Sequence, residues 1–241
     1  MKTQIKLGSI VRHGIGGPQS GAIALIYEFL LGELNQTSYK YISVNQIGDD
    51  LDEVIVKMPV GQIYVNVRYP ADEDFKSKSI DEQNRIRLEI MHTGLLRIAK
   101  HEGKLDIGQL ESIKEKILTN NFSFSFLVKT FTNPRSSSLS ANLIIEPKMD
   151  RFDYFISTVE NRTEKCKVLI YEGATSVYYF GYFFTKAKWK GDNELIITGN
   201  RKEVAIHVLM DKCKVVYESL AELSETSAFE IYKANSRPKN N

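Results

Sequence analysis

The spacing of hydrophobic positions along this chain changes near residue 120. Before that point, apolar residues recur every three or four positions in three segments, as on one face of an α-helix. After it, apolar and polar residues alternate, as in a half-buried β-strand. The pattern predicts an α+β protein with a large antiparallel, meander-like β-sheet and three helices. Two of these helices are expected to form an antiparallel pair packed on the sheet.

Three helices are predicted in the first half, at residues 20–34, 81–102 and 107–119. The first has a wide apolar face, which indicates burial on most sides. The other two carry narrower apolar stripes and are separated by only a few residues, which is why they are expected to lie antiparallel.

The ends of the second and third helices carry capping signals. Asp81 and Asp106 are the expected N-caps, and Gly103 is the expected C-cap of the second helix. On the second helix, Arg87 falls outside the main apolar stripe and is expected in solvent, whereas His92 is expected to be partly buried.

Strands are expected on both sides of these helices. In the first half they cover residues 3–12 and 39–47 and a hairpin, 54–69, that turns at Pro59-Val60-Gly61. In the second half they are expected at residues 122–128, 139–146, 151–160, 166–172, 176–190, 194–198 and 203–218. Short connections rich in turn residues, such as Gly199-Asn200, predict consecutive antiparallel pairing.

The domain organisation follows from the same change of spacing. Residues 1–220 are expected to form a single α+β domain, because the helices need a sheet to cover. A sub-boundary near residue 120 would separate a mixed α/β half, residues 1–120, from an antiparallel half, residues 121–220. Residues 221–241 lose all pattern and are expected to be a partly disordered tail.

Composition and charge narrow the class of protein. With 42% hydrophobic and 26% charged residues, the chain has a globular composition, and its formal charge of +2 disfavours a nucleic-acid partner. The most apolar stretch, residues 22–34, is shorter than the roughly 20 residues of a membrane span and is interrupted by charges. The start lacks the apolar run of a signal peptide. A soluble, cytoplasmic protein without a membrane association is expected.

The two cysteines, Cys166 and Cys213, lie in apolar, strand-like surroundings. Buried free thiols are the first expectation. A disulfide between paired strands is the alternative, which spacing alone does not decide.

A glycine-rich turn between the first strand and the first helix is the best candidate for a ligand site. Such a turn directs backbone N–H groups toward an anion. The residues after Gly21 are Ala22 and Ile23, so the lysine and hydroxyl of a P-loop are absent. A structural loop is therefore the competing interpretation. The candidate ligand-binding residues are His13, Gly14, Gly16, Gly17 and Ser20.

The segment 177–190 is a candidate interaction surface. Six of its first eight residues are aromatic, and it ends in alternating lysines around the only tryptophan. Alternation puts the tryptophan on the face opposite the lysines, which weakens any nucleic-acid interpretation. Burial in the sheet core is the competing interpretation of the aromatic residues. The candidate residues are Tyr178, Tyr182, Lys186, Lys188, Trp189 and Lys190.

Metal and catalytic sites are not expected. The acidic segment 49–53 lacks the spacing of a calcium loop, although it could meet a basic partner. Glu89 and His92 would need a second such pair to bind a metal. No metal and no cofactor are expected.

Three functions therefore stand as hypotheses. The first is a non-enzymatic protein that binds another, unidentified protein through a sheet face or the acidic loops. The second is an enzyme or small-ligand binder with a pocket at the Gly14–Gly21 loop beside His13. The third is a nucleic-acid-binding module that uses the lysine-bearing strands.

Overall fold

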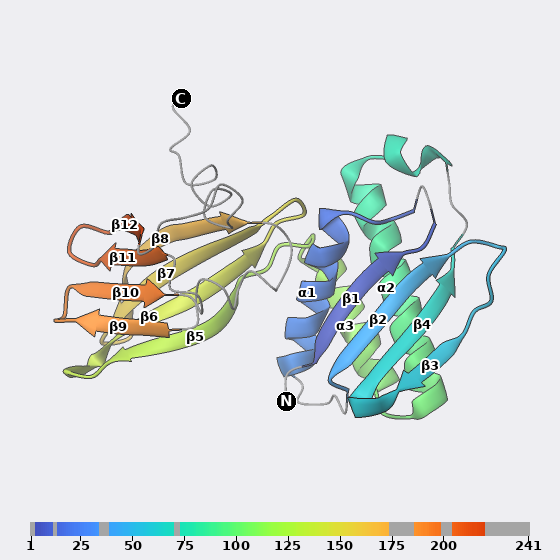
Figure 1. Ribbon diagram of the computed structural model, residues 1–241, viewed down its shortest axis with the longest axis horizontal. Coiled ribbons are helices and arrows are strands. Elements are labelled where there is room, and N and C mark those ends of the chain that lie inside the picture. The colour runs from blue at the N-terminus through green and yellow to red at the C-terminus, as the bar shows by residue number, and fades with distance from the viewer. Residues whose placement is uncertain are drawn as a thin grey trace. The chain divides into compact units, whose positions relative to one another are not determined.

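The computed structural model describes residues 3–11, 14–33, 39–69, 73–173, 186–198 and 204–219 (Figure 1). These residues form three α-helices and twelve strands, which confirms the α+β class. Contacts divide the chain into an N-terminal unit, Met1–Phe124, and a C-terminal unit, Ser125–Asn241. Cooperative folding of residues 1–220 as one domain stays a prediction. The predicted tail, 221–241, lies outside the described residues.

The N-terminal unit contains a four-stranded sheet of order β1-β2-β4-β3. Its strands are β1 (Gln4–Ser9), β2 (Tyr41–Ile47), β3 (Ile55–Met58) and β4 (Gln62–Arg68). β1, β2 and β4 are parallel, whereas β3 is antiparallel to β4 and forms an edge. The expected hairpin is confirmed.

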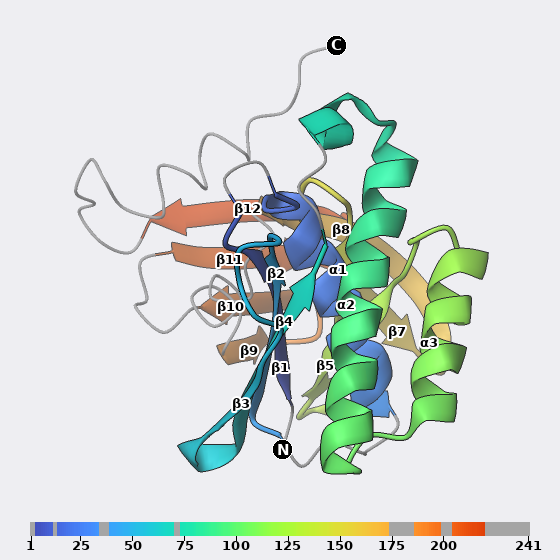
Figure 2. The ribbon, with the colours of Figure 1, turned by 90° about the vertical axis from the view of Figure 1, so that its right-hand side faces the viewer.

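Three helices lie on one side of this sheet: α1 (Pro18–Glu33), α2 (Ile80–Glu102) and α3 (Ile107–Thr119) (Figures 1 and 2). α1 packs on β1, α2 packs on β2 and β4, and α3 packs on α1 and α2. α2 thus packs on the sheet that precedes it in the chain, and α3 packs against α2. No described helix is long and apolar enough to cross a membrane.

The helix ends follow local hydrogen bonding. α2 begins one residue earlier than expected because Ser79, not Asp81, is its N-cap. The Ser79 side chain accepts from the Glu82 amide, and the Glu82 carboxylate accepts from the Ser79 amide, which forms a capping box. Gly103 and Asp106 cap as expected, with Gly103 in the left-handed conformation at a φ of 65°.

The predicted strand 122–128 is wrong over its first four residues. The chain leaves α3 through Asn121 and Phe122, whose φ angles are 46° and 59°, so the backbone is left-handed where a strand was expected. Phe122 is buried although it is not in a strand. An alternating pattern can therefore arise from a helix exit as well as from a strand.

The C-terminal unit consists of two four-stranded antiparallel sheets instead of the single large sheet expected. In each sheet, consecutive strands are neighbours, which confirms the meander. One sheet has β5 (Phe126–Asn133), β6 (Ser136–Pro147), β7 (Phe152–Glu160) and β8 (Thr163–Gly173). The other has β9 (Lys186–Lys190), β10 (Glu194–Thr198), β11 (Val204–Leu209) and β12 (Lys214–Ser219).

Polar and covalent links join the two sheets of this unit. Trp189 on β9 donates to the Phe131 carbonyl on β5 (3.2 Å), and Tyr217 on β12 donates to the Ile170 carbonyl on β8 (3.1 Å). Cys166 on β8 and Cys213 in the β11–β12 turn form a disulfide, with 5.6 Å between their Cα atoms. The first expectation, free thiols, is wrong, because chain spacing does not reveal that the two sheets face one another.

Candidate functional site

The loop between β1 and α1 is held on both sides of Ile15. The Ile15 amide donates to the Gln46 side-chain oxygen (2.9 Å), and the Ile15 carbonyl accepts from the Ser20 hydroxyl (2.7 Å). Gln46, at the end of β2, also accepts from Ser9 (2.9 Å) and donates to the Tyr69 carbonyl (3.1 Å). Since the N–H and the C=O of Ile15 are both bonded to side chains, the backbone is held in place at Ile15.

The structure places three of the five predicted ligand residues, Gly14, Gly16 and Gly17, in this loop and Ser20 in the first turn of α1, whereas His13 lies outside the described residues. Gly14 leaves no space for a side chain, because a Cβ there would lie 1.8 Å from the Ser9 Oγ. Gly16 and Gly17 are exposed at the tip, with Gly17 at a φ of 131°. Ser20 is buried and directed at the loop backbone. The tip, not Ser20, is therefore what a ligand would meet.

Arg87 on α2 also holds the loop, and the expectation that it lies in solvent is wrong. Its side chain donates from Nε to the Ile15 carbonyl (3.0 Å), and its guanidinium lies over the Phe75 ring, 4.9 Å from the centroid. Only 3% of the residue is exposed. Position 87 is buried because the loop and Phe75 lie against a side of α2 that the main apolar stripe does not include.

The charge of Arg87 is not neutralised by a described carboxylate. Its terminal nitrogens reach only the Gln83 Oε1, at 3.5 Å. Burial lowers the pKa of Arg87 to about 10, so the guanidinium is still protonated at neutral pH. The nearby Asn84 side-chain oxygen on α2 is also buried without a hydrogen bond in the described part of the chain. Among the described residues, the positive charge beneath the glycine loop is therefore uncompensated.

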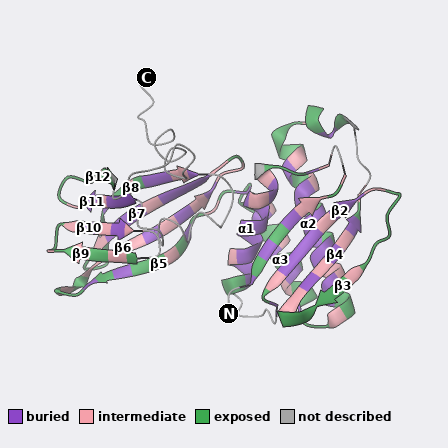
Figure 3. Cartoon of the chain, viewed as in Figure 1, coloured by how far each residue is buried: buried purple, intermediate pink, exposed green. Residues whose placement is uncertain are grey.

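The free edge of β3 is a second unusual feature of the N-terminal unit (Figure 3). Every second residue of β3 and of its two flanking segments is a large apolar side chain with much of its surface exposed; these are Val54, Val56, Met58 and Val60. We call these four residues the β3 ridge. Val60 is 72% exposed and has a φ of 66°, a conformation that β-branched residues avoid. Neither packing nor backbone preference favours valine there.

Exposed acidic residues precede the β3 ridge. Glu53 accepts from Arg97 (2.8 Å) and from the Arg68 amide (2.8 Å). Asp49, Asp50 and Asp52 are exposed and form no ion pair with the described residues. Sequence reasoning identified this acidic segment and the hairpin, but it missed the ridge. Its signal was the apolar residue at every second position from 54 to 60.

The candidate lysines lie on one face of β9, as alternation predicts. Lys186, Lys188 and Lys190 are exposed, whereas Trp189 points to the opposite side and donates to β5. The other lysine-bearing strands are not neighbours of β9, because β12 is at the far edge of the same sheet and β8 belongs to the other sheet. The described strands therefore do not assemble these lysines into one surface. Tyr178 and Tyr182 lie outside the described residues.

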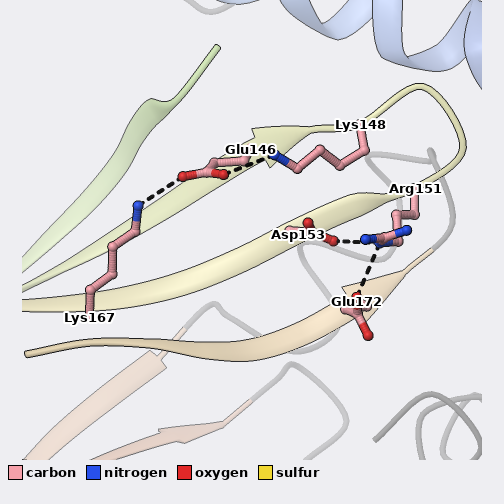
Figure 4. Close-up of polar contacts among 6 residues, drawn as sticks. All are labelled: Glu146, Lys148, Arg151, Asp153, Lys167 and Glu172. Carbon is pink, nitrogen blue, oxygen red and sulfur yellow. Dashed lines mark hydrogen bonds and ion pairs between the residues drawn. The ribbon is translucent and has the colours of Figure 1, made fainter. Parts of the chain in front are cut away.

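Charged residues also cluster on β6, β7 and β8 (Figure 4). The residues drawn are Glu146, Lys148, Arg151, Asp153, Lys167 and Glu172. Glu146 accepts from Lys167 (2.8 Å) and Lys148 (3.1 Å), while Arg151 pairs with Asp153 (2.9 Å) and Glu172 (3.1 Å). Burial raises the pKa of Asp153, and the hydrogen bond from Arg151 opposes that shift. Each carboxylate here has a cation partner, which fits a role in stabilising the sheet.

The described histidines do not assemble a metal site. His92 contacts Tyr27 and Glu111, and His207 lies between Glu194 (2.7 Å) and Glu218 (2.9 Å). Within the described ranges, no group of three or more metal-ligating side chains has a suitable arrangement.

Comparison of the chain with protein-family models, curated proteins and solved structures finds no match. The geometry of the loop and of the β3 ridge therefore carries the functional argument.

Proposed function

We propose that this chain is a non-enzymatic binding protein that takes up an extended segment of another protein along the β3 edge. The observation that carries the proposal is the β3 ridge: Val56 and Met58 lie on the edge strand of the described sheet, and Val54 and Val60 flank it, all four with exposed apolar side chains. Proteins usually protect such edges with charges, prolines or a covering element, because an apolar edge recruits other strands. β3 carries one such charge, Lys57, and Pro59 follows its last residue, but the Lys57 ammonium is paired with Glu102 (2.9 Å). The exposed apolar side chains of the ridge are therefore still suited to an added strand.

The backbone of β3 is available for pairing. The Asn66 amide donates to the Val54 carbonyl, so by the alternation of an antiparallel ladder Val56 and Met58 also bond toward β4. The N–H and C=O groups of Ile55 and Lys57 then point away from the sheet. An added strand would bond to these groups and place its own apolar side chains against the ridge.

Charge selects the chemistry of the partner. Asp49, Asp50 and Asp52, which form no ion pair within the described ranges, lie shortly before the ridge, and the Lys57 ammonium is already paired with Glu102 (2.9 Å). A partner segment with alternating apolar residues and basic residues at one end fits both features. The acidic residues would accelerate association and fix the direction of the segment.

Site-specific photocrosslinking tests the proposal. A photoreactive residue at position 56 of the full chain, in its host, is expected to capture one protein through a segment with this pattern. The affinity of the purified pair should fall at least about tenfold in the double variant Val56→Lys, Met58→Lys, because both side chains would leave the apolar contact. Leu127→Lys is the control, since Leu127 is another exposed apolar strand residue, on β5 of the C-terminal unit.

A second pair of variants tests whether the outward backbone groups of β3 bind the partner segment. Lys57→Pro removes an outward N–H without removing a bond to β4, whereas Lys57→Gln removes only the ion pair with Glu102. Binding should be lost in the proline variant and retained in the glutamine variant. Crosslinking to a second copy of this chain, or unchanged affinity in the ridge variant, would refute the proposal.

A further inference from the structure

We infer that the N-terminal unit also binds a phosphate group at the tip of the β1–α1 loop, with Arg87 supplying positive charge from behind the Ile15–Gly16 peptide. This site is separate from the β3 edge and uses no residue of the β3 ridge.

The Ile15–Gly16 peptide lies between Arg87, on its inner side, and the exposed tip of the loop, on its outer side. The carbonyl and the following N–H of a trans peptide point in opposite directions, and the described chain has no cis peptide bond. Since the Ile15 carbonyl points inward to Arg87 and Ser20, the Gly16 N–H points outward. Two donors on the carbonyl, one of them charged, polarise the peptide and strengthen this N–H as a donor.

The outward side of the loop can accept a ligand. Gly16 and Gly17 are both exposed, and a Cβ built on Gly16 would have no described neighbour within 4 Å. The loop leads directly into the 16-residue helix α1, whose first turn contains no acidic residue. Backbone N–H groups and a helix N-terminus together favour a phosphate, which accepts several hydrogen bonds at once.

Buried charge is the observation that distinguishes this loop from an ordinary strand-to-helix turn. A guanidinium that is 3% exposed is costly unless a negative charge compensates it, and no described carboxylate does so. A phosphate at the tip would supply that charge across a single peptide. Inorganic phosphate and a phosphorylated small molecule share this chemistry.

Titration with inorganic phosphate tests the inference in the full chain. Thermal unfolding and ¹⁵N-resolved amide spectra are followed at constant ionic strength, with chloride as the reference anion. Phosphate is expected to stabilise the N-terminal unit in a saturable manner and to shift the Gly16 and Gly17 amide signals. A phosphorylated nucleoside and a sugar phosphate are titrated in parallel, and tighter binding of either one would identify the source of the phosphate group.

Two variants assign the effect to the residues named. Arg87→Met replaces an unneutralised buried charge with an apolar side chain of similar length, so stability without phosphate should be retained or increased. Its phosphate affinity should fall at least tenfold. Gly16→Ala adds a methyl group at the tip and should also weaken phosphate binding, whereas Gly32→Ala, another open glycine in the same unit, should not.

The inference fails if phosphate has no more effect than chloride on the wild-type chain. It also fails if Arg87→Met and Gly16→Ala bind phosphate as tightly as the wild type. Should Arg87→Met not fold, the comparison of Gly16→Ala with Gly32→Ala decides the question.

Discussion

His92 lies buried where the three helices of the N-terminal unit meet. The Tyr27 hydroxyl of α1 lies 2.9 Å from Nδ1 of His92, and Glu111 of α3 lies 3.2 Å from Nε2. The Glu111 contact has the distance of an ion pair but not the geometry of a good hydrogen bond, since Nε2 has no hydrogen-bond partner in the described chain. Because burial raises the pKa of Tyr27, its hydroxyl stays protonated and can donate to Nδ1.

Burial lowers the pKa of His92, and Glu111 opposes that shift only in part. Lys114 also disfavours the imidazolium, while Glu89, which pairs with Lys114 (2.7 Å), favours it. The unfolded chain therefore binds a proton more readily than the folded unit. The free energy of unfolding should fall as pH decreases from 7.5 through the ordinary pKa of histidine, with a slope of at most about 1.4 kcal/mol per pH unit.

Urea unfolding measured between pH 5.5 and 7.5 checks this prediction. His92→Asn keeps an acceptor for Tyr27 but does not titrate, so its stability should depend less on pH than that of the wild type. An identical pH dependence in the two proteins would show that His92 is not the responsible group.

At the scale of elements, Gly94 determines how closely α2 approaches the sheet. A Cβ at this position would lie 2.6 Å from a methyl group of Val44 on β2 and 3.1 Å from one of Val65 on β4. These are core side chains between a helix and a sheet, so they have little freedom to move aside. A glycine inside a helix, normally unfavourable, is here required by packing.

Gly94→Ala is expected to lower the free energy of unfolding by about 1–3 kcal/mol, because overpacking outweighs the better helix propensity of alanine. Gly32→Ala in α1 is the control, since no described atom lies within 4 Å of its added Cβ. That variant should be neutral or slightly stabilising. Chemical denaturation of both variants provides the measurement, and equal stability in the two would contradict the account.

The sequence predicts a helix or strand well where the hydrophobic pattern and the residues that stabilise its ends both lie within or next to that element. Residues 107–119 form a helix with the predicted bounds, because both the apolar stripe and the Asp106 cap are local. The pattern fails at Phe122, where a left-handed helix exit imitates strand alternation. It also fails at Arg87, because the burial of this side chain depends on a distant segment. The Ile15 carbonyl that Arg87 contacts is 72 positions away in the sequence.

At the scale of the whole molecule, the C-terminal unit has its two sheets joined by Cys166–Cys213. The sequence separation of 47 residues closes a long loop, which restricts the unfolded chain. Disulfides persist mainly in oxidising compartments, so this bond weighs against the predicted cytoplasmic location, which stays a prediction.

Removing the disulfide with Cys166→Ala, Cys213→Ala is expected to lower the stability of the C-terminal unit by about 2–4 kcal/mol. Hydrogen exchange followed by mass spectrometry resolves the effect along the chain. Protection should fall in Ser125–Asn241 and stay unchanged in Met1–Phe124, because contacts divide the chain at that boundary. An equal loss of protection in both units would instead support the predicted single cooperative domain.

The sequence by itself determined the α+β class, the three helices, the hairpin at β3, the meander and the glycine loop. These features depend on periodicity, caps and turns, which act over a few residues. Tertiary structure decided what a ligand or partner would meet. Whether β3 is an edge, whether Arg87 is buried and whether two cysteines meet all depend on segments distant in sequence. Hydrophobic packing brings those segments together, and no local pattern records the result.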